Sequence, residues 1–299
     1  MFQYFLKKRL KKHDLNNNLK LEALVRCQLL GLHASNSAEP GVGNSKKHNI
    51  VISLTSYDKR IHDLYLCIES LFQQSVKADT IVLWLSTKNF PDRSLPESLK
   101  RQQQRGLQVF FVDEDLGPYK KYTYTFDKFP DSLIVTVDDD VLYPPDMIDL
   151  LYRAYEKDPS KIYCHRAHRM RLDKKGTLLP YGSWQSSIRD SEASHLVFPT
   201  GMGGVLYPPN SLHKDAFDPE KFMTLCPNAD DIWLKAMSIK NGTLAARISD
   251  PRCWRNRFLM IQGSQDHALM KENHTNRQGN DFKLEKVFSE YDLYHFLKS

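Results

Sequence analysis

Short hydrophobic runs alternate with stretches of helical periodicity along most of the chain. The runs are rich in β-branched residues and are bounded by polar or turn-forming residues, as is typical of strands buried on both faces of a sheet. They occupy residues 50–54, 80–85, 109–112, 133–137 and 162–164. Between them, apolar residues recur on one helical face, for example from Ile61 to Phe72. The pattern predicts an α/β fold with a mostly parallel sheet flanked by helices.

The N-terminal segment differs from the rest of the chain. Residues 1–33 are predicted to be helical, and the small and polar residues of 34–47 predict a linker. We therefore expect a basic helical segment with its linker at 1–48 and the main domain at 49–299. Five lysines and arginines fall within residues 1–12, among aromatic residues and leucines. This basic segment either makes a peripheral contact with an anionic membrane or is a solvated terminal helix, and the pattern favours neither interpretation.

Composition excludes several classes of protein. The chain has 299 residues, and none of its apolar runs approaches the roughly 20 residues that a membrane span needs. Its five cysteines are scattered without a CxxC pair, which favours neither a disulfide framework nor a zinc site and fits a reducing cytoplasm. Basic residues cluster at the N-terminus and not along a recognisable reading element, so we expect no nucleic-acid partner for the net charge of +6.

Three consecutive aspartates, Asp138, Asp139 and Asp140, directly follow the run at 133–137. Like charges packed together repel one another, so the trio is expected at the strand's carboxyl end, at the sheet edge where open α/β folds bind ligands. Hard cations take carboxylate oxygens, and we therefore predict a site for Mn²⁺ or Mg²⁺. The trio alone does not separate a nuclease from a nucleotidyltransferase or a glycosyltransferase.

Four features follow one another in an order that resembles a known family. They are the loop 55–57 after the first strand, the acids 138–140, a glycine loop at 201–204 and the acidic pair 230–231. Together they resemble the GT-A fold of nucleotide-sugar-dependent glycosyltransferases, in particular bacterial enzymes similar to family 2 that build capsule or lipopolysaccharide chains. The resemblance covers about residues 49–245. The chain departs from the family by carrying aspartate, not glutamate, at the first position of the acidic pair.

The resemblance implies a role for each acid. Asp138 would lie near the donor ribose and share the metal, Asp140 would bind the metal that bridges the diphosphate, and Asp139 would assist in donor binding. Asp231 is the expected catalytic base, which takes the proton from the acceptor hydroxyl, with Asp230 as the alternative. Both acids of the pair would also suit the first turn of an ordinary helix, where carboxylates are favoured.

Nine further residues are expected around the substrates. In the loop after the first strand, Thr55, Tyr57 and Arg60 would contact the base or ribose, and Lys121, before the acidic strand, would contact the diphosphate. A late histidine, His267, would bind the metal. The acceptor would be contacted by Gly203, Gly204, Trp184 and Trp233. The plainer alternatives are packing for the aromatic residues, solvent exposure for the lysine and a structural role for the histidine.

These expectations combine into a metal-dependent enzyme that moves a sugar, with inversion, from a nucleoside-diphosphate sugar such as a UDP-sugar to a saccharide or lipid-linked acceptor in cell-surface polysaccharide synthesis. It would work in the cytoplasm, on the inner face of the cell membrane. Two alternatives stay open. A nucleotidyltransferase that makes an activated sugar would normally carry a glycine-rich, basic loop after its first strand, and residues 54–60 contain no glycine. A non-catalytic carbohydrate-binding protein would not need both acidic sites intact.

Overall fold

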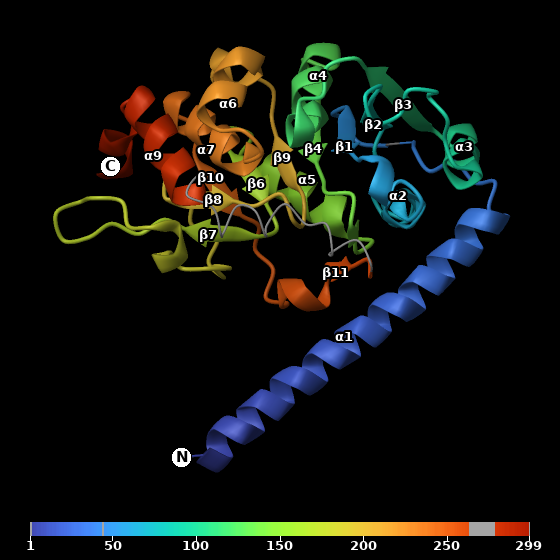
Figure 1. Ribbon diagram of the computed structural model, residues 1–299, viewed down its shortest axis with the longest axis horizontal. Coiled ribbons are helices and arrows are strands. Elements are labelled where there is room, and N and C mark those ends of the chain that lie inside the picture. The colour runs from blue at the N-terminus through green and yellow to red at the C-terminus, as the bar shows by residue number, and fades with distance from the viewer. Residues whose placement is uncertain (1, 44, 263–278, 299) are drawn as a thin grey trace.

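A seven-stranded sheet forms the centre of the protein (Figure 1). The structure is a computed structural model, and it describes residues 2–43, 45–262 and 279–298. The strand order is β10-β6-β9-β4-β1-β2-β3. These strands are β1 (Ile50–Thr55), β2 (Thr80–Ser86), β3 (Leu107–Val112), β4 (Leu133–Thr136), β6 (Ile162–Cys164), β9 (Val205–Tyr207) and β10 (Ala245–Arg247). The predicted α/β fold with a mostly parallel sheet is confirmed.

Strand β9 runs antiparallel to both of its neighbours in this sheet. Thr136 of β4 and Cys164 of β6 both pair with Val205 of β9. The remaining pairs, which join β1 to β2 and β4, β2 to β3, and β6 to β10, are parallel. Because β9 runs the opposite way, the loop that precedes it lies at the edge where β4 and β6 end. This arrangement brings distant segments of the chain together at one edge.

Helices cover both faces of the sheet and enclose two large hydrophobic cores, beside a small third cluster of Val51, Val82, Trp84 and Ile134. Leu133 and Val135 of β4 pack in the core with α2 and α5, whereas Val205 and Tyr207 of β9 pack in the core with α4, α7 and α9. Successive strand residues point to opposite faces, so strands covered on both sides are hydrophobic throughout. The helices of the two faces are α2 (Leu64–Phe72), α3 (Glu97–Gln104), α4 (Lys120–Lys128), α5 (Met147–Lys157), α6 (Pro219–Leu225), α7 (Asp230–Lys240) and α9 (Asn280–Glu290).

Two small sheets and several short helices were not predicted. Strand β5 (Val141–Leu142) pairs with β11 (Leu259–Met260), and β7 (Ala167–Arg169) pairs with β8 (Val197–Pro199). Strands of two or three residues are too short to show a period of two. Helix α4 also escaped prediction, because its aromatic and β-branched residues form helices weakly in isolation. The short 3₁₀ helices are η1 (Asp58–Arg60), η2 (Gly117–Tyr119), η3 (Tyr181–Ser183), η4 (Lys214–Phe217), η5 (Trp254–Asn256) and η7 (Leu293–Lys298).

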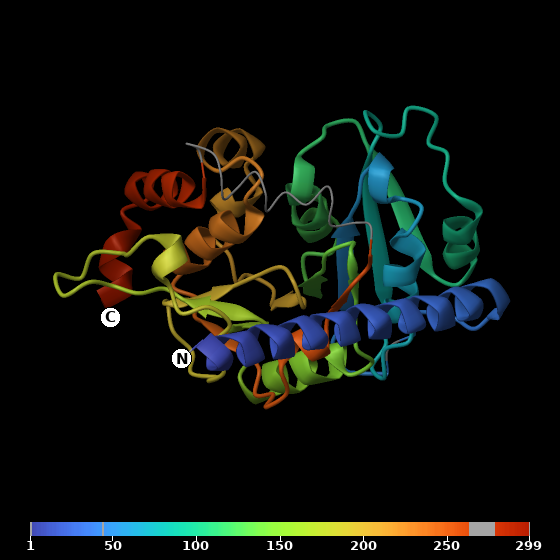
Figure 2. The same cartoon turned by 60° about the horizontal axis from the view of Figure 1, so that its bottom comes forward.

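Helix α1 (Phe2–Asn36) is a single long helix that runs along one side of the molecule (Figures 1 and 2). It ends three residues beyond the predicted helix at 1–33. It packs against α2 and β11, and its His33 Nδ1 lies 2.6 Å from Oε1 of the buried Glu69 of α2. No helix in the described ranges is both long and apolar enough to cross a membrane. The domain boundary at 48/49 stays a prediction.

Candidate active site

The three aspartates lie at the carboxyl edge of the sheet, where the sequence places them. They follow β4 directly, and Ser56 follows the neighbouring strand β1. The glycine loop 201–204 leads into β9 at the same edge. The acidic pair 230–231 opens α7. Segments that are distant in the sequence, from Ser56 to Asp231, therefore contribute to one site.

Arg60 and Ser56 hold the second and third acids of the trio. Ser56 Oγ donates to Asp139 Oδ2 at 2.6 Å, and Arg60 Nη1 donates to Asp139 Oδ1 at 2.6 Å. The same nitrogen lies 3.2 Å from Asp140 Oδ2. Burial, together with the Asp138 and Asp139 carboxylates, raises the pKa of Asp140 to about 7. The Arg60 guanidinium thus contacts the acids, and its expected contact with the donor base or ribose stays a prediction.

Thr55 and Tyr57, the other residues expected at the donor base, differ in their surroundings. Thr55 Oγ1 donates to the backbone oxygen of Trp84 at 2.7 Å, so its hydroxyl joins β1 to β2. The Tyr57 ring is partly exposed, and its centre lies 5.5 Å from the guanidinium carbon of Arg60. Tyr57 is therefore placed beside the acids, and its contact with a ligand stays a prediction.

Lys121 joins the two acidic segments. Its ammonium group lies 3.0 Å from Asp138 Oδ1 and 3.0 Å from Asp230 Oδ2, and its side chain is 7% exposed. Burial alone would lower the pKa of Lys121, but the Asp138 and Asp230 carboxylates raise it well above its usual value. The lysine is therefore a protonated bridge between β4 and α7. The solvent-facing alternative is wrong, and the expected contact of Lys121 with a diphosphate stays a prediction.

Asp231 and Asp138 approach each other across Gly201. The backbone N–H of Gly201 donates to both oxygens of Asp231, at 3.0 and 3.1 Å. A Cβ atom on Gly201 would lie 3.1 Å from Asp138 Oδ1 and 3.3 Å from Asp231 Oδ1. Burial raises the pKa of Asp231 to about 7, and the adjacent Asp230 contributes in the same direction. The site thus holds two carboxylates, those of Asp140 and Asp231, whose pKa is raised to about 7.

Gly203 and Gly204 shape the loop and are not exposed. Their φ angles are +104° and +91°, in the left-handed region that favours glycine. A Cβ on Gly203 would lie 3.2 Å from the Cβ of His165, and one on Gly204 would lie 3.3 Å from Met147 Sδ. Both glycines are buried, which speaks against the expected contact with an acceptor.

The two tryptophans expected to stack on a sugar belong to the core, and this expectation is wrong. Trp233 has no exposed surface, and its Nε1 donates to the backbone oxygen of Ala216 at 3.1 Å. Trp184 is 7% exposed and donates to the backbone oxygen of Leu179 at 2.7 Å. A ring whose faces are covered by neighbouring side chains cannot receive a sugar.

The charge balance of the site suits a divalent cation. Five carboxylates, at 138–140 and 230–231, lie around two cations that pair with them, Lys121 and Arg60. Asp138 is 32% exposed at its side chain, so its oxygens are accessible. Within the described ranges, no group of three or more His, Cys, Asp or Glu side chains is placed to hold a metal, and the expected Mn²⁺ or Mg²⁺ stays a prediction. His267, the expected late ligand, lies outside the described residues.

Arg166 and Trp254 border the site, although the sequence pattern does not single them out. Arg166 follows β6, and its Nη1 donates to Thr200 Oγ1 at 3.2 Å, next to Gly201. Its guanidinium carbon lies 4.5 Å from the centre of the Trp254 ring. Both residues line a cavity of about 110 Å³. An isolated arginine or tryptophan has no spacing signal, which explains why sequence reasoning missed them.

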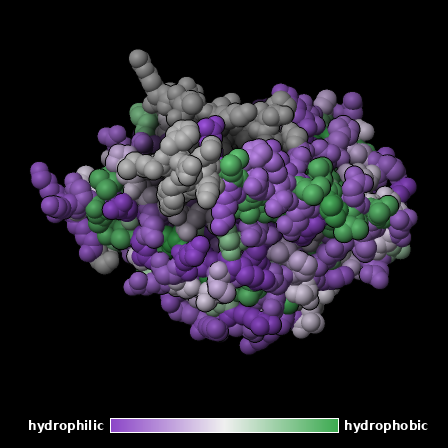
Figure 3. Space-filling model, turned by 90° about the horizontal axis from the view of Figure 1, so that it is seen from below, coloured by the Kyte–Doolittle hydropathy of each residue, from purple (hydrophilic) through white to green (hydrophobic). Residues whose placement is uncertain are grey.

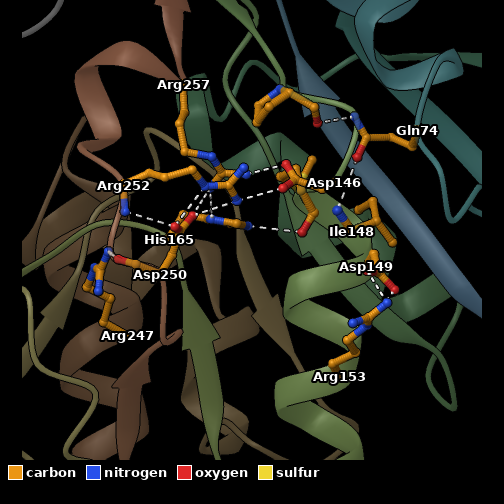
Figure 4. A network of polar contacts seen from close by, with 12 residues as sticks. Gln74, Asp146, Ile148, Asp149, Arg153, His165, Arg247, Asp250, Arg252 and Arg257 are labelled. Carbon is orange, nitrogen blue, oxygen red and sulfur yellow. Dashed lines mark hydrogen bonds and ion pairs between the residues drawn. The ribbon is translucent and has the colours of Figure 1, made fainter.

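Two arginines fix the segment that precedes β11 to the start of α5 (Figure 4). Arg252 Nη2 lies 2.6 Å from Asp146 Oδ2, and Arg257 Nη1 lies 2.6 Å from Asp250 Oδ2. Arg257 also pairs with Asp146. His165 lies within this network, and burial lowers its pKa to about 3, so it is neutral at physiological pH. The network holds Trp254 in place at the border of the site.

Comparisons with known proteins show a distant likeness only. No family model and no curated protein matches the chain. Among solved structures, an inositol-1-phosphate CTP transferase from T. maritima is 11% identical with a TM-score of 0.42, and it covers 86% of this chain and 98% of its own. A 4-diphosphocytidyl-2C-methyl-D-erythritol synthase is 15% identical with a TM-score of 0.45, covering 74% and 95%. A CMP:2-keto-3-deoxy-manno-octonic acid synthetase complexed with CTP is 12% identical with a TM-score of 0.37, covering 68% and 89%.

These proteins are not named as glycosyltransferases, so the comparisons do not return the family 2 likeness that the sequence motifs suggest. With such identities and TM-scores, the likeness does not decide a reaction for this chain.

Proposed function

We propose that the protein is a glycosyltransferase that uses a nucleoside-diphosphate sugar. The proposal rests on one observation: Asp138 and Asp231 face each other across Gly201 in unlike environments. Asp138 is partly exposed and paired with Lys121, whereas Asp231 accepts from the backbone N–H of Gly201 and its pKa is raised to about 7. Two neighbouring carboxylates with different partners suit a reaction in which one holds a charged donor and the other moves a proton.

Asp231 has the properties that a general base needs. A base works best when its pKa lies near the operating pH, and the pKa of Asp231 is about 7. The N–H of Gly201 orients its carboxylate. In an inverting transfer, Asp231 takes the proton of the acceptor hydroxyl while that oxygen attacks the anomeric carbon. Asp230, the alternative base, is already engaged by Lys121.

Asp138 and Asp140 are the residues that would hold Mn²⁺ or Mg²⁺. Such an ion, when bound, offsets the charge that develops on the leaving diphosphate. Arg60 and Ser56 fix the trio in place through Asp139. The proposed acceptor is a saccharide or lipid-linked saccharide of cell-surface polysaccharide synthesis, handled on the inner face of the cell membrane. The sequence resemblance supports this last part of the proposal.

A sugar-nucleotide nucleotidyltransferase is the second candidate, because carboxylates at the edge of a nucleotide-binding sheet would serve it as well. The loop after β1 speaks against this alternative. Residues 54–60 contain no glycine for a phosphate loop, and Arg60 is occupied by Asp139 and Asp140. A non-catalytic scaffold would have no use for a carboxylate that the Gly201 N–H holds at the site with its pKa raised to about 7.

A substrate screen tests the proposal. The purified chain is incubated with nucleoside-diphosphate sugars, with and without Mn²⁺, and release of nucleotide is followed. In a parallel arm it receives nucleoside triphosphates with sugar phosphates, and release of diphosphate is followed. We expect metal-dependent nucleotide release that is lost in Asp140→Asn and kept in Asp149→Asn, a matched change in the first turn of α5, where Asp149 pairs with Arg153.

Every other outcome of the screen counts against the proposal. Diphosphate release from a triphosphate would make the protein a nucleotidyltransferase. Turnover without metal would overturn the role of Asp138 and Asp140, and no turnover of any donor would favour the non-catalytic scaffold.

A further inference from the structure

Exposed hydrophobic side chains gather on α1. Nine large hydrophobic residues are exposed in the described part of the chain, and seven of them belong to this helix. Their exposed fractions lie between 45% and 62%. They are Leu10, Leu15, Leu21, Leu24, Val25, Leu29 and Leu32. Figure 3 looks at the side of the molecule along which α1 runs, and it shows hydrophobic groups among hydrophilic ones.

Six of the seven residues form one stripe. Eleven residues make about three turns of an α-helix, so Leu10, Leu21 and Leu32 follow one another in a line along its axis. Leu24, Val25 and Leu29 lie on either side of that line. The residues that α1 buries, Ala23, Leu30 and Ala34, lie on the opposite side of the helix. One apolar face thus attaches α1 to the body of the protein, and a second apolar face is left outside.

The same helix carries most of the net charge of the protein. Residues 2–36 contain seven lysines and arginines and two acidic residues, a formal charge of +5, whereas the whole chain has +6. The remaining residues are therefore almost neutral. A strongly basic helix with an exposed apolar stripe is the combination that lies in the interface of an anionic bilayer.

We propose that the outer face of α1, defined by Leu10, Leu21, Leu24, Val25, Leu29 and Leu32, binds an anionic lipid bilayer and lies parallel to its surface. The charge decides between this occupant and a second copy of the chain, since pairing two such helices would bring +5 against +5. The expectation from the sequence concerned residues 1–12 alone and left a solvated helix equally open. The proposal extends the contact over the helix to Leu32, and it does not depend on the reaction that the acids catalyse.

Vesicle sedimentation tests the proposal with the full chain. The vesicles consist of phosphatidylcholine alone or of an equimolar mixture of phosphatidylcholine and phosphatidylglycerol. We expect binding to the mixed vesicles, weakened by salt, and little binding to phosphatidylcholine. The triple variant Leu21→Ser, Val25→Ser, Leu32→Ser keeps the charge and removes the stripe, and we expect it to reduce partitioning at least about tenfold.

Phe282→Ser in α9 is the matched control, because Phe282 is 46% exposed and lies outside α1; its binding should equal that of the unaltered chain. Circular dichroism checks that the triple variant keeps its helix. Three results would overturn the proposal: no binding to mixed vesicles, equal binding of the triple variant, or a dimer in light scattering that this variant abolishes. Nucleotide release with a water-soluble acceptor is measured separately, so a failure of the lipid proposal is distinguishable from a failure of the proposed reaction.

Discussion

Replacing Asp231 by asparagine should slow the reaction and stabilise the fold in a pH-dependent way. The structure raises the pKa of Asp231 from 3.8 to about 7, which corresponds to about 4 kcal/mol. The folded state therefore binds this proton more tightly than the unfolded state does. The free energy of unfolding therefore falls as the pH rises from about 4 to about 7, because Asp231 ionises more readily in the unfolded state. Above pH 7 the whole destabilisation is present. An amide of the same shape does not ionise and avoids this cost.

We expect Asp231→Asn to raise the free energy of unfolding by up to about 4 kcal/mol at pH 8 and by less than half of that at pH 5. Denaturation by urea at the two pH values measures both. Loss of a general base should reduce turnover by about 100-fold to 10,000-fold in the nucleotide-release assay. The unaltered enzyme should lose activity progressively as the pH falls below about 7, because Asp231 becomes protonated.

Asp230→Asn serves as the paired control. It removes one of the two carboxylates that hold Lys121, so we expect lower stability and a much smaller loss of turnover. Near-normal turnover of Asp231→Asn, or a greater loss in Asp230→Asn, would refute the assignment of the base. A gain in stability that is the same at pH 5 and pH 8 would refute the electrostatic reasoning.

Two further predictions follow from contacts around the acids. Lys121→Met leaves Asp138 and Asp230 without their shared cation, so the free energy of unfolding should fall by about 3 kcal/mol or more. Denaturation by urea measures this, and an unchanged value would mean that the bridge is not formed. Gly201→Ala should abolish most turnover with little effect on melting temperature, because φ at Gly201 is not in the left-handed region and the added methyl group would meet Asp138 at 3.1 Å. Gly204→Ala should leave turnover nearly unchanged but lower the free energy of unfolding by about 1–2 kcal/mol, because the φ angle of Gly204 is +91°. Equal effects of the two alanine substitutions on turnover and on melting temperature would contradict this account.

The strands and the acidic trio could be predicted from the sequence because their signals are local. A strand covered on both faces needs a continuous hydrophobic run, and the runs at 50–54, 80–85 and 133–137 predict β1, β2 and β4. Three charges after such a run cannot be buried together without a partner, which places 138–140 at the sheet edge. Those features depend on neighbours in the sequence alone.

The partners of these acids were decided by the tertiary structure. The antiparallel pairing of β9 with β4 brings Gly201 between Asp138 and Asp231, and no local pattern encodes this pairing. Burial of Trp233 likewise follows from how α7 packs, since a tryptophan suits a core and a sugar site equally well.

Helix α1 shows the same division. Its leucines and lysines are plain in the sequence, but apolar residues occur on two opposite sides of the helix. Packing against α2 and β11 covers one side and leaves the other exposed. Composition and periodicity determined that α1 is a basic helix with apolar residues. The three-dimensional fold decided which of them are available to a partner, because burial depends on contacts between segments that are distant in the chain.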